Sequence, residues 1–264
     1  MAELDDAYAN AAYIPGAADY PPRWERAAAA LREGLLEQGL ADLDQPYGES
    51  ARQRFDLFHP GGTAKGLMIF VHGGYWLRFD KSVWSHLAAG ALTQGWAVAM
   101  PSYDLCPKVR IADITRQIAA AVTAAAGMVA GPIALAGHSA GGHLVARMLQ
   151  PGLLGDAVAD RLHHVMPISP VSDLHPLLRT SMNAEFKLDA AAARAESPAL
   201  MTERLPVPVT VWVGADERPV FLDQARWLAE AWGCAHVVDQ GKHHFDVIDA
   251  LADTQSDMIG RLLG

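Results

Sequence analysis

One serine lies in a setting that suits nucleophilic chemistry. The sequence Gly137-His-Ser-Ala-Gly141 places Ser139 between an apolar run, residues 132–136, that predicts a short buried strand and residues 140–149, which predict a helix. A strand that turns directly into a helix strains the residue at the turn, and flanking glycines leave room for it. The serine would stand at a helix N-terminus, where negative charge is favoured. We therefore predict that Ser139 attacks an ester or amide carbonyl, although the same residues could form a turn without chemistry.

A pair of glycines follows the apolar run at residues 67–71, in the sequence His72-Gly-Gly-Tyr-Trp76. Attack on a carbonyl produces a negatively charged oxygen, and each backbone N–H group aimed at it lowers the barrier by roughly 2.7–4 kcal/mol. Glycine allows the backbone to approach a substrate closely. We expect this oxyanion hole to combine the N–H of Ala140 with those of Gly73 and Gly74, of which Gly74 is favoured. A tight turn without this role is the alternative.

A serine nucleophile of this kind is followed along the chain first by an acid and then by a histidine. The apolar run at residues 209–214 ends just before Asp216, so this carboxylate would lie at the same sheet edge as the serine. We predict Asp216 as the acid. Glu217 is the second choice, and Asp173, which follows the predicted strand at residues 164–168, is the other candidate by position.

The base is expected after the last predicted strand, residues 235–239, where two histidines are adjacent. An imidazole with an unperturbed pKa near 6.5 can take the serine proton and return it to the leaving group at neutral pH. We predict His244 as the base because it immediately precedes Phe245, which would open a helix. His243 is the alternative.

Short apolar runs alternate with helical patterns along most of the chain. Strands are expected at 54–58, 67–71, 96–100, 132–136, 164–168, 207–213 and 235–239, and helices at 109–129, 140–149, 219–232 and 245–263. Continuous apolar strands that alternate with helices indicate a mainly parallel central sheet with helices on both faces. The segment 171–200 breaks the rhythm and is expected to form a small cap-like excursion over the sheet edge. Residues 1–48 precede the periodic part, and we expect 1–264 to form a single domain.

Composition narrows the class of protein. The 264 residues carry a formal net charge of -9, which does not suit binding to nucleic acid phosphates. There are two cysteines, Cys106 and Cys234, which are expected as free thiols in a reducing, cytoplasmic setting. No signal peptide or membrane span is expected. A small-molecule substrate is the expected partner, and a homodimer is left open.

The spacing of the histidines, cysteines and glycines indicates whether a cofactor motif is present. No zinc spacing, phosphate loop or dinucleotide motif stands in a suitable context. We therefore expect no cofactor and no metal, since serine and histidine supply both the nucleophile and the base.

The motifs at 72–76 and 137–142, with His244-Phe245, together resemble the kynurenine formamidase (arylformamidase) branch of the α/β hydrolases. The neighbouring esterase branch more often reads His-Gly-Gly-Gly in the early loop, so the Tyr-Trp ending is the distinguishing part. The resemblance extends from about residue 54 to the C-terminus, and residues 8–24 are also similar, though less specifically. It implies the α/β-hydrolase fold, the triad Ser139, Asp216 and His244, and the glycine loop.

The resemblance leads to three hypotheses. The first is a serine hydrolase that cleaves small acyl groups from aryl amides or esters, with N-formylkynurenine as the leading substrate. Tyr75 and Trp76 would then supply an aromatic substrate wall, although either could be an ordinary packing residue. The second is a general short-chain carboxylesterase, and the third is a non-catalytic binding member of the fold. Substrate choice is expected to depend on the pocket shape set by residues 171–200.

Overall fold

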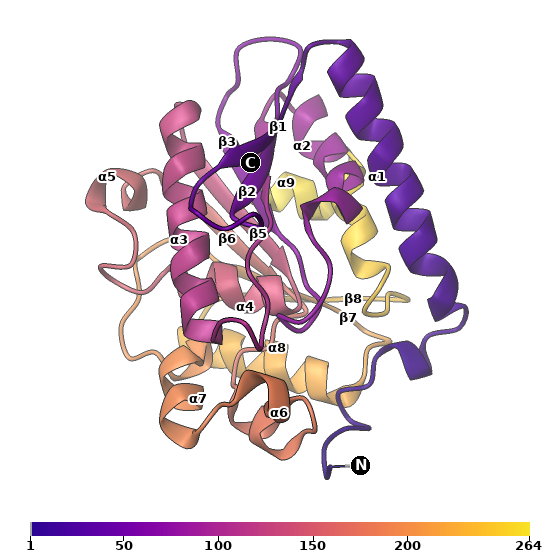
Figure 1. Ribbon diagram of the computed structural model, residues 1–264, viewed down its shortest axis with the longest axis vertical. Coiled ribbons are helices and arrows are strands. Elements are labelled where there is room, and N and C mark those ends of the chain that lie inside the picture. The colour runs from indigo at the N-terminus through magenta and orange to yellow at the C-terminus, as the bar shows by residue number, and fades with distance from the viewer. Residues whose placement is uncertain (1) are drawn as a thin grey trace.

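The computed structural model describes residues 2–264. Its centre is an eight-stranded sheet in the order β1-β2-β4-β3-β5-β6-β7-β8 (Figure 1). The strands are β1 (Ala41–Pro46), β2 (Arg54–Phe58), β3 (Leu67–Val71), β4 (Ala97–Pro101), β5 (Ile133–His138), β6 (Leu162–Ile168), β7 (Thr210–Gly214) and β8 (Ala235–Asp239). Strand β2 runs antiparallel to both of its neighbours, β1 and β4, and β3 to β8 are parallel to one another. The predicted α/β-hydrolase fold, with its mainly parallel sheet, is confirmed.

Helices cover both faces of the sheet. They are α1 (Tyr20–Glu37), α2 (Ala89–Thr93), α3 (Ile111–Met128), α4 (Ala140–Arg147), α5 (Asp156–Ala159), α6 (Asn183–Phe186), α7 (Ala190–Glu196), α8 (Pro219–Trp232) and α9 (Asp257–Leu263). Figure 1 shows α3, α4 and α8 on one side of the sheet and α1, α2 and α9 on the other. A parallel sheet covered in this way must be apolar on both faces.

Strand β3 shows how one apolar run serves two cores. Side chains alternate between the faces of a strand. Leu67, Ile69 and Val71 accordingly pack in the core beneath α3, α4 and α8, whereas Met68 and Phe70 pack in the core beneath α1 and α9. All five residues of β3 are buried, which explains why the run has no polar alternation.

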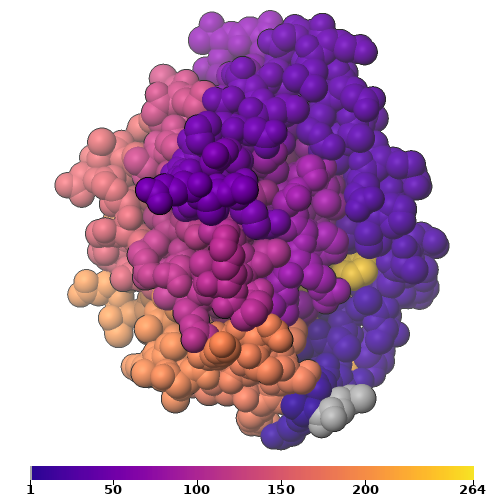
Figure 2. Space-filling model, viewed as in Figure 1, coloured from indigo at the N-terminus to yellow at the C-terminus, as the bar shows by residue number. Residues whose placement is uncertain are grey.

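The N-terminal residues cross from one face of the sheet to the other. Tyr8 packs in the first core, where its ring meets Phe221 of α8 edge-on, and Trp24 of α1 packs in the second. In Figure 2 these indigo residues lie along one side of the molecule and meet the orange residues near position 180 at its lower edge. Leu4 donates a backbone hydrogen bond to Arg179 there, at 3.2 Å. This crossing passes over the edge of the sheet where the serine lies.

The structure differs from the sequence prediction in two elements. The helix expected over 245–263 is divided into a 3₁₀ segment, Val247–Ala252, and α9. The division follows from Ser256, whose hydroxyl accepts the N–H of Ile259 at 3.1 Å and begins a new helix. Strand β1 lies in the N-terminal region, where no strand was expected. It pairs at the sheet edge and none of its residues is fully buried, so its sequence has no continuous apolar run. Between residues 2 and 264, no helix combines the length and apolarity needed to cross a membrane.

Candidate active site

The nucleophile elbow joins β5 to α4. Ser139 occupies the turn with φ 56° and ψ −116°, a conformation that is strained for a residue with a side chain. A Cβ at Gly137 would lie 2.2 Å from the carbonyl oxygen of Gly141, and a Cβ at Gly141 would lie 1.9 Å from that of Val71. Both positions therefore require glycine. The turn presents Ser139 to a large cavity.

The glycine loop after β3 lies directly against the serine. A Cβ at Gly73 would lie 2.9 Å from the carbonyl oxygen of His138 and 3.0 Å from the Cβ of Ser139. Gly74 has φ 111° and also lines the cavity. Within residues 2–264, the N–H groups of Gly73 and Gly74 donate to no protein acceptor. Ala140 is the first residue of α4, so its N–H has no partner within the helix. The three expected oxyanion donors thus meet around one serine.

His72 braces this loop from behind. Its Nδ1 lies 2.7 Å from the Gly73 carbonyl, and its ring stacks on Tyr103 with centroids 4.4 Å apart. The Tyr103 hydroxyl donates to the His72 carbonyl at 2.9 Å. Burial lowers the pKa of His72 to about 4, so its ring is neutral at physiological pH.

The carboxylate that faces His244 belongs to Glu217. Its Oε2 lies 2.6 Å from His244 Nδ1, and both side chains are buried. The other oxygen, Oε1, accepts the N–H of Gly214 at 2.9 Å and the hydroxyl of Ser169. With these bonds made, the carboxylate is fixed in one orientation toward the imidazole.

The expectation that Asp216 would occupy this position is wrong. After β7 ends at Gly214, the chain turns so that the N–H of Glu217 donates back to the Gly214 carbonyl at 3.3 Å. Asp216 lies at the outer corner of the turn, where its side chain is exposed, and Glu217 returns over the strand end. The second sequence choice is therefore the residue that contacts the histidine. Asp173, the third, instead contacts His175 at 2.8 Å.

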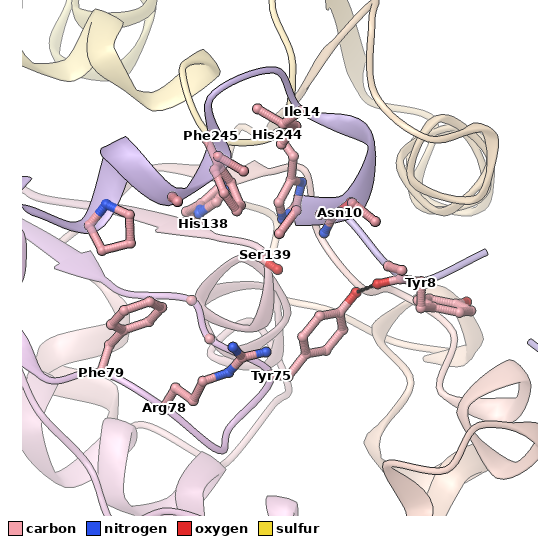
Figure 3. A pocket seen from close by; sticks show the side chains of 18 of the residues that line it. Tyr8, Asn10, Ile14, Tyr75, Arg78, Phe79, His138, Ser139, His244 and Phe245 are labelled. Atoms are coloured by element: carbon pink, nitrogen blue, oxygen red, sulfur yellow. Dashed lines mark hydrogen bonds between the residues drawn. The ribbon is translucent and has the colours of Figure 1, made fainter. Parts of the chain in front are cut away.

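The two adjacent histidines face different parts of the structure. His244 lines the cavity with Ser139, and Figure 3 shows its ring above the serine. His243 places its Nε2 3.0 Å from the Tyr20 hydroxyl of α1 and its Nδ1 3.1 Å from an oxygen of Asp246. Of the two histidines, His244 is therefore the one that shares the cavity with Ser139.

His138, which precedes the serine, was not singled out from the sequence. Its ring lies 4.6 Å from that of His244, and burial, followed by the nearby charge of His244, holds the pKa of His138 well below 6.5. A neutral ring at this place packs against His244 without adding a competing positive charge. In the sequence, only the position of His138 between Gly137 and the serine could have indicated that its ring packs against the histidine of the site.

The cavity above Ser139 has a volume of about 1240 Å³. Residues between Asp5 and Ala18 form one of its walls, whereas Ser181 and Met182 are the part of 171–200 that lines it. The expectation that 171–200 would set the pocket shape is therefore wrong in its main part. The N-terminal segment has this position because it crosses the edge of the sheet that carries the serine.

Hydrogen bonds fix the N-terminal segment to the site. Tyr75 donates its hydroxyl to the Tyr8 carbonyl at 2.7 Å, as Figure 3 shows. Gln224 of α8 donates to the Tyr8 hydroxyl at 2.9 Å, and Arg218 contacts the Asp6 carboxylate at 2.8 Å. The N-terminal wall of the cavity is thus held by side chains from both the glycine loop after β3 and α8.

The aromatic wall of the cavity differs from the expected one. Tyr75 lines the cavity, but Trp76 does not: its side chain is 0% exposed and packs edge-on against His143 and Phe186, with centroids 5.1 and 5.6 Å away. The wall is completed instead by four other aromatic residues, Trp24, Phe79, Trp84 and Phe245. Trp76 is therefore a residue of the hydrophobic core rather than of the cavity wall.

The described part of the chain, residues 2–264, contains no group of three or more histidine, cysteine or acidic side chains arranged to hold a metal. Cys106 and Cys234 are not paired with each other. Burial raises the pKa of the Cys106 thiol to about 11, so this thiol is not an activated nucleophile.

Known proteins resemble this chain over most of its length. Kynurenine formamidase of Salmo salar is 28% identical over 244 residues, covering 85% of this chain and 82% of that protein. A crystal structure from Silicibacter sp. TM1040, provisionally named a thioesterase, is 63% identical with a TM-score of 0.98 and full coverage of both chains. A phosphonate-inhibited esterase B of Lactobacillus rhamnosis has 17% identity and a TM-score of 0.67, covering 84% of this chain and 82% of its own, and it shows the shared fold.

A match to a protein-family model shows the family of the chain. A family model described as the alpha/beta hydrolase fold matches residues 68–210, which span the glycine loop and the nucleophile elbow. Together with the sheet order and the strained serine, this match shows that the chain belongs to the α/β-hydrolase fold family.

Proposed function

We propose that this protein is a serine hydrolase that removes small acyl groups from aryl amides or esters, with N-formylkynurenine as the leading substrate. The observation that carries the proposal is the buried Glu217–His244 pair, whose histidine lines one cavity with Ser139 beside a loop of free backbone N–H groups. Kynurenine formamidase relatives at modest identity support the formamide substrate.

The geometry supports a two-step reaction. Ser139 attacks the carbonyl carbon while His244 Nε2 takes its proton, and Glu217 stabilises the imidazolium that forms. The N–H groups of Gly73, Gly74 and Ala140 bind the negative oxygen. His244 then gives its proton to the departing amine or alcohol, and a water molecule activated by the same histidine releases the acyl group from Ser139.

The four-residue aromatic wall favours an aryl leaving group. Trp24, Phe79, Trp84 and Phe245 line the cavity next to the serine. They contact one another edge-on or tilted, with Trp24 and Trp84 centroids 4.7 Å apart. Such rings offer apolar faces and edges on which a substrate ring can stack.

A general short-chain carboxylesterase is the second candidate, because the same triad would serve it. A non-catalytic role would leave the strained serine and the buried acid–histidine pair without a use. The test compares kcat/KM for N-formylkynurenine and formanilides with kcat/KM for p-nitrophenyl esters from formyl to hexanoyl, and for thioesters of the same acyl groups. We expect amide cleavage and a rate that falls with acyl length. Rates that rise through hexanoyl without amide cleavage would favour the esterase.

The matching variant is Ser139→Ala. It should reduce kcat by about 10⁶-fold, as expected when a serine nucleophile is lost from a complete triad, and it should abolish labelling by a fluorophosphonate. Full activity in this variant, with wild-type enzyme excluded, would contradict the mechanism.

A further inference from the structure

The loop that follows the oxyanion glycines carries a positive charge into the cavity. Within residues 2–264, Arg78 is the one basic side chain, counting lysine and arginine, that lines the cavity. Figure 3 shows its guanidinium directed toward Ser139, beside the Tyr75 ring. The Arg78 side chain forms no hydrogen bond or ion pair with the other described residues. Within residues 2–264, no other group therefore pairs with this charge.

The acidic side chains nearest the cavity are already occupied. Asp5 accepts the N–H of Ser181 at 2.6 Å, and Asp6 contacts Arg218 at 2.8 Å. Arg218 also lies over the Tyr13 ring, 3.6 Å from its centroid. In contrast to Arg218, which has a structural task, Arg78 has its donors available for a ligand.

The loop that presents Arg78 is rigid and strained. Tyr75, Trp76 and Phe79 all have positive φ, of 53°, 55° and 69°. Arg52 donates to the Phe79 carbonyl and, at 2.7 Å, to that of Tyr103, which fixes the far end of the loop. Strain of this kind persists where the surrounding structure enforces it, and it is concentrated at binding and catalytic sites.

We infer that Arg78 is a specificity-determining residue that binds a carboxylate carried by the leaving group of the acyl donor. A guanidinium offers paired donors that match a carboxylate in geometry and charge. The adjacent Phe79 belongs to the aromatic wall, so a leaving group stacked there would extend toward Arg78. The inference rests on the proposed function and adds that an anionic leaving group is preferred, although the protein as a whole carries a formal net charge of -9.

The experiment uses matched substrate pairs. Each pair is an aryl compound with a carboxylate on its side chain and the methyl ester of that carboxylate, prepared as a formamide series and as an aryl acetate series. We expect the wild-type protein to prefer the carboxylate over the methyl ester by roughly 10- to 100-fold in kcat/KM, mainly through KM, the range expected for a charged hydrogen bond. The preference should decrease as salt is added.

Three variants separate recognition from general charge. In Arg78→Met the preference ratio should fall toward one, and Arg78→Lys should retain part of it. The control is Arg226→Met, which removes the same charge from an exposed pair with Asp223 on α8 and should retain the full ratio. A wild-type protein without a preference, or a ratio unchanged in Arg78→Met, would overturn the inference. If only the acetate series is cleaved and its preference depends on Arg78, the inference stands and the formamidase function fails.

Discussion

Replacing Glu217 with glutamine tests the acid assignment with little change in shape. The glutamine Oε1 can still accept the N–H of Gly214 and the hydroxyl of Ser169, but its amide would now face His244 Nδ1. An N–H at this place forces Nδ1 to act as the acceptor and leaves the proton on Nε2, where it cannot take the serine proton. The wrong tautomer costs about 10⁴-fold in kcat, or about 5.4 kcal/mol of barrier, when a triad acid is converted to its amide.

The control is the neighbouring residue. The Asp216 side chain is exposed, and its backbone N–H donates to the Lys242 carbonyl at 2.9 Å, so Asp216→Asn should stay within about twofold of wild type. Initial rates with a p-nitrophenyl ester, together with thermal unfolding of each variant, provide the measurement. If Asp216→Asn lost the activity while a folded Glu217→Gln kept it, the geometric reasoning would be refuted.

Three further predictions follow from packing and burial. Gly141→Ala should prevent folding or strongly destabilise the protein in urea unfolding, because its Cβ would lie 1.9 Å from a carbonyl oxygen, whereas Gly34→Ala, with open space around it in α1, should stabilise by about 0.5–1 kcal/mol. Tyr75→Phe removes the bond to the Tyr8 carbonyl and should raise KM and speed proteolysis of the N-terminal segment, with a stability loss of about 1 kcal/mol; unchanged proteolysis would contradict it. Burial lowers the pKa of His143 to about 4, so the unfolded state binds more protons between pH 6.5 and 4. The free energy of unfolding should therefore decrease as the pH is lowered from 6.5 to 4, by about 3 kcal/mol for this residue. A free energy of unfolding that stays constant over this range would contradict the prediction.

The sequence by itself determined the nucleophile elbow and the glycine loop. Both are local: strand, turn and helix follow one another within a few residues, and steric limits leave glycine as the residue that fits at Gly137 and Gly141. The apolar runs likewise determined a parallel sheet, because a strand buried on both faces has no polar alternation. Chain order then predicted an acid near the end of β7 and His244 after β8.

Tertiary structure decided which of two neighbouring side chains reaches each position. Asp216 and Glu217 follow the same strand, and only the turn after Gly214 determines which carboxylate reaches the histidine. Tyr75 and Trp76 are likewise adjacent, yet one lines the cavity and the other is buried in the core.

The N-terminal wall was beyond sequence reasoning for a related reason. It depends on contacts between distant parts of the chain, such as the bond from Gln224 to the Tyr8 hydroxyl across 216 positions. Periodicity records which face of an element is buried, but it carries no information about which distant segment covers that face. The shape of the cavity above Ser139 therefore became visible only once the chain was folded.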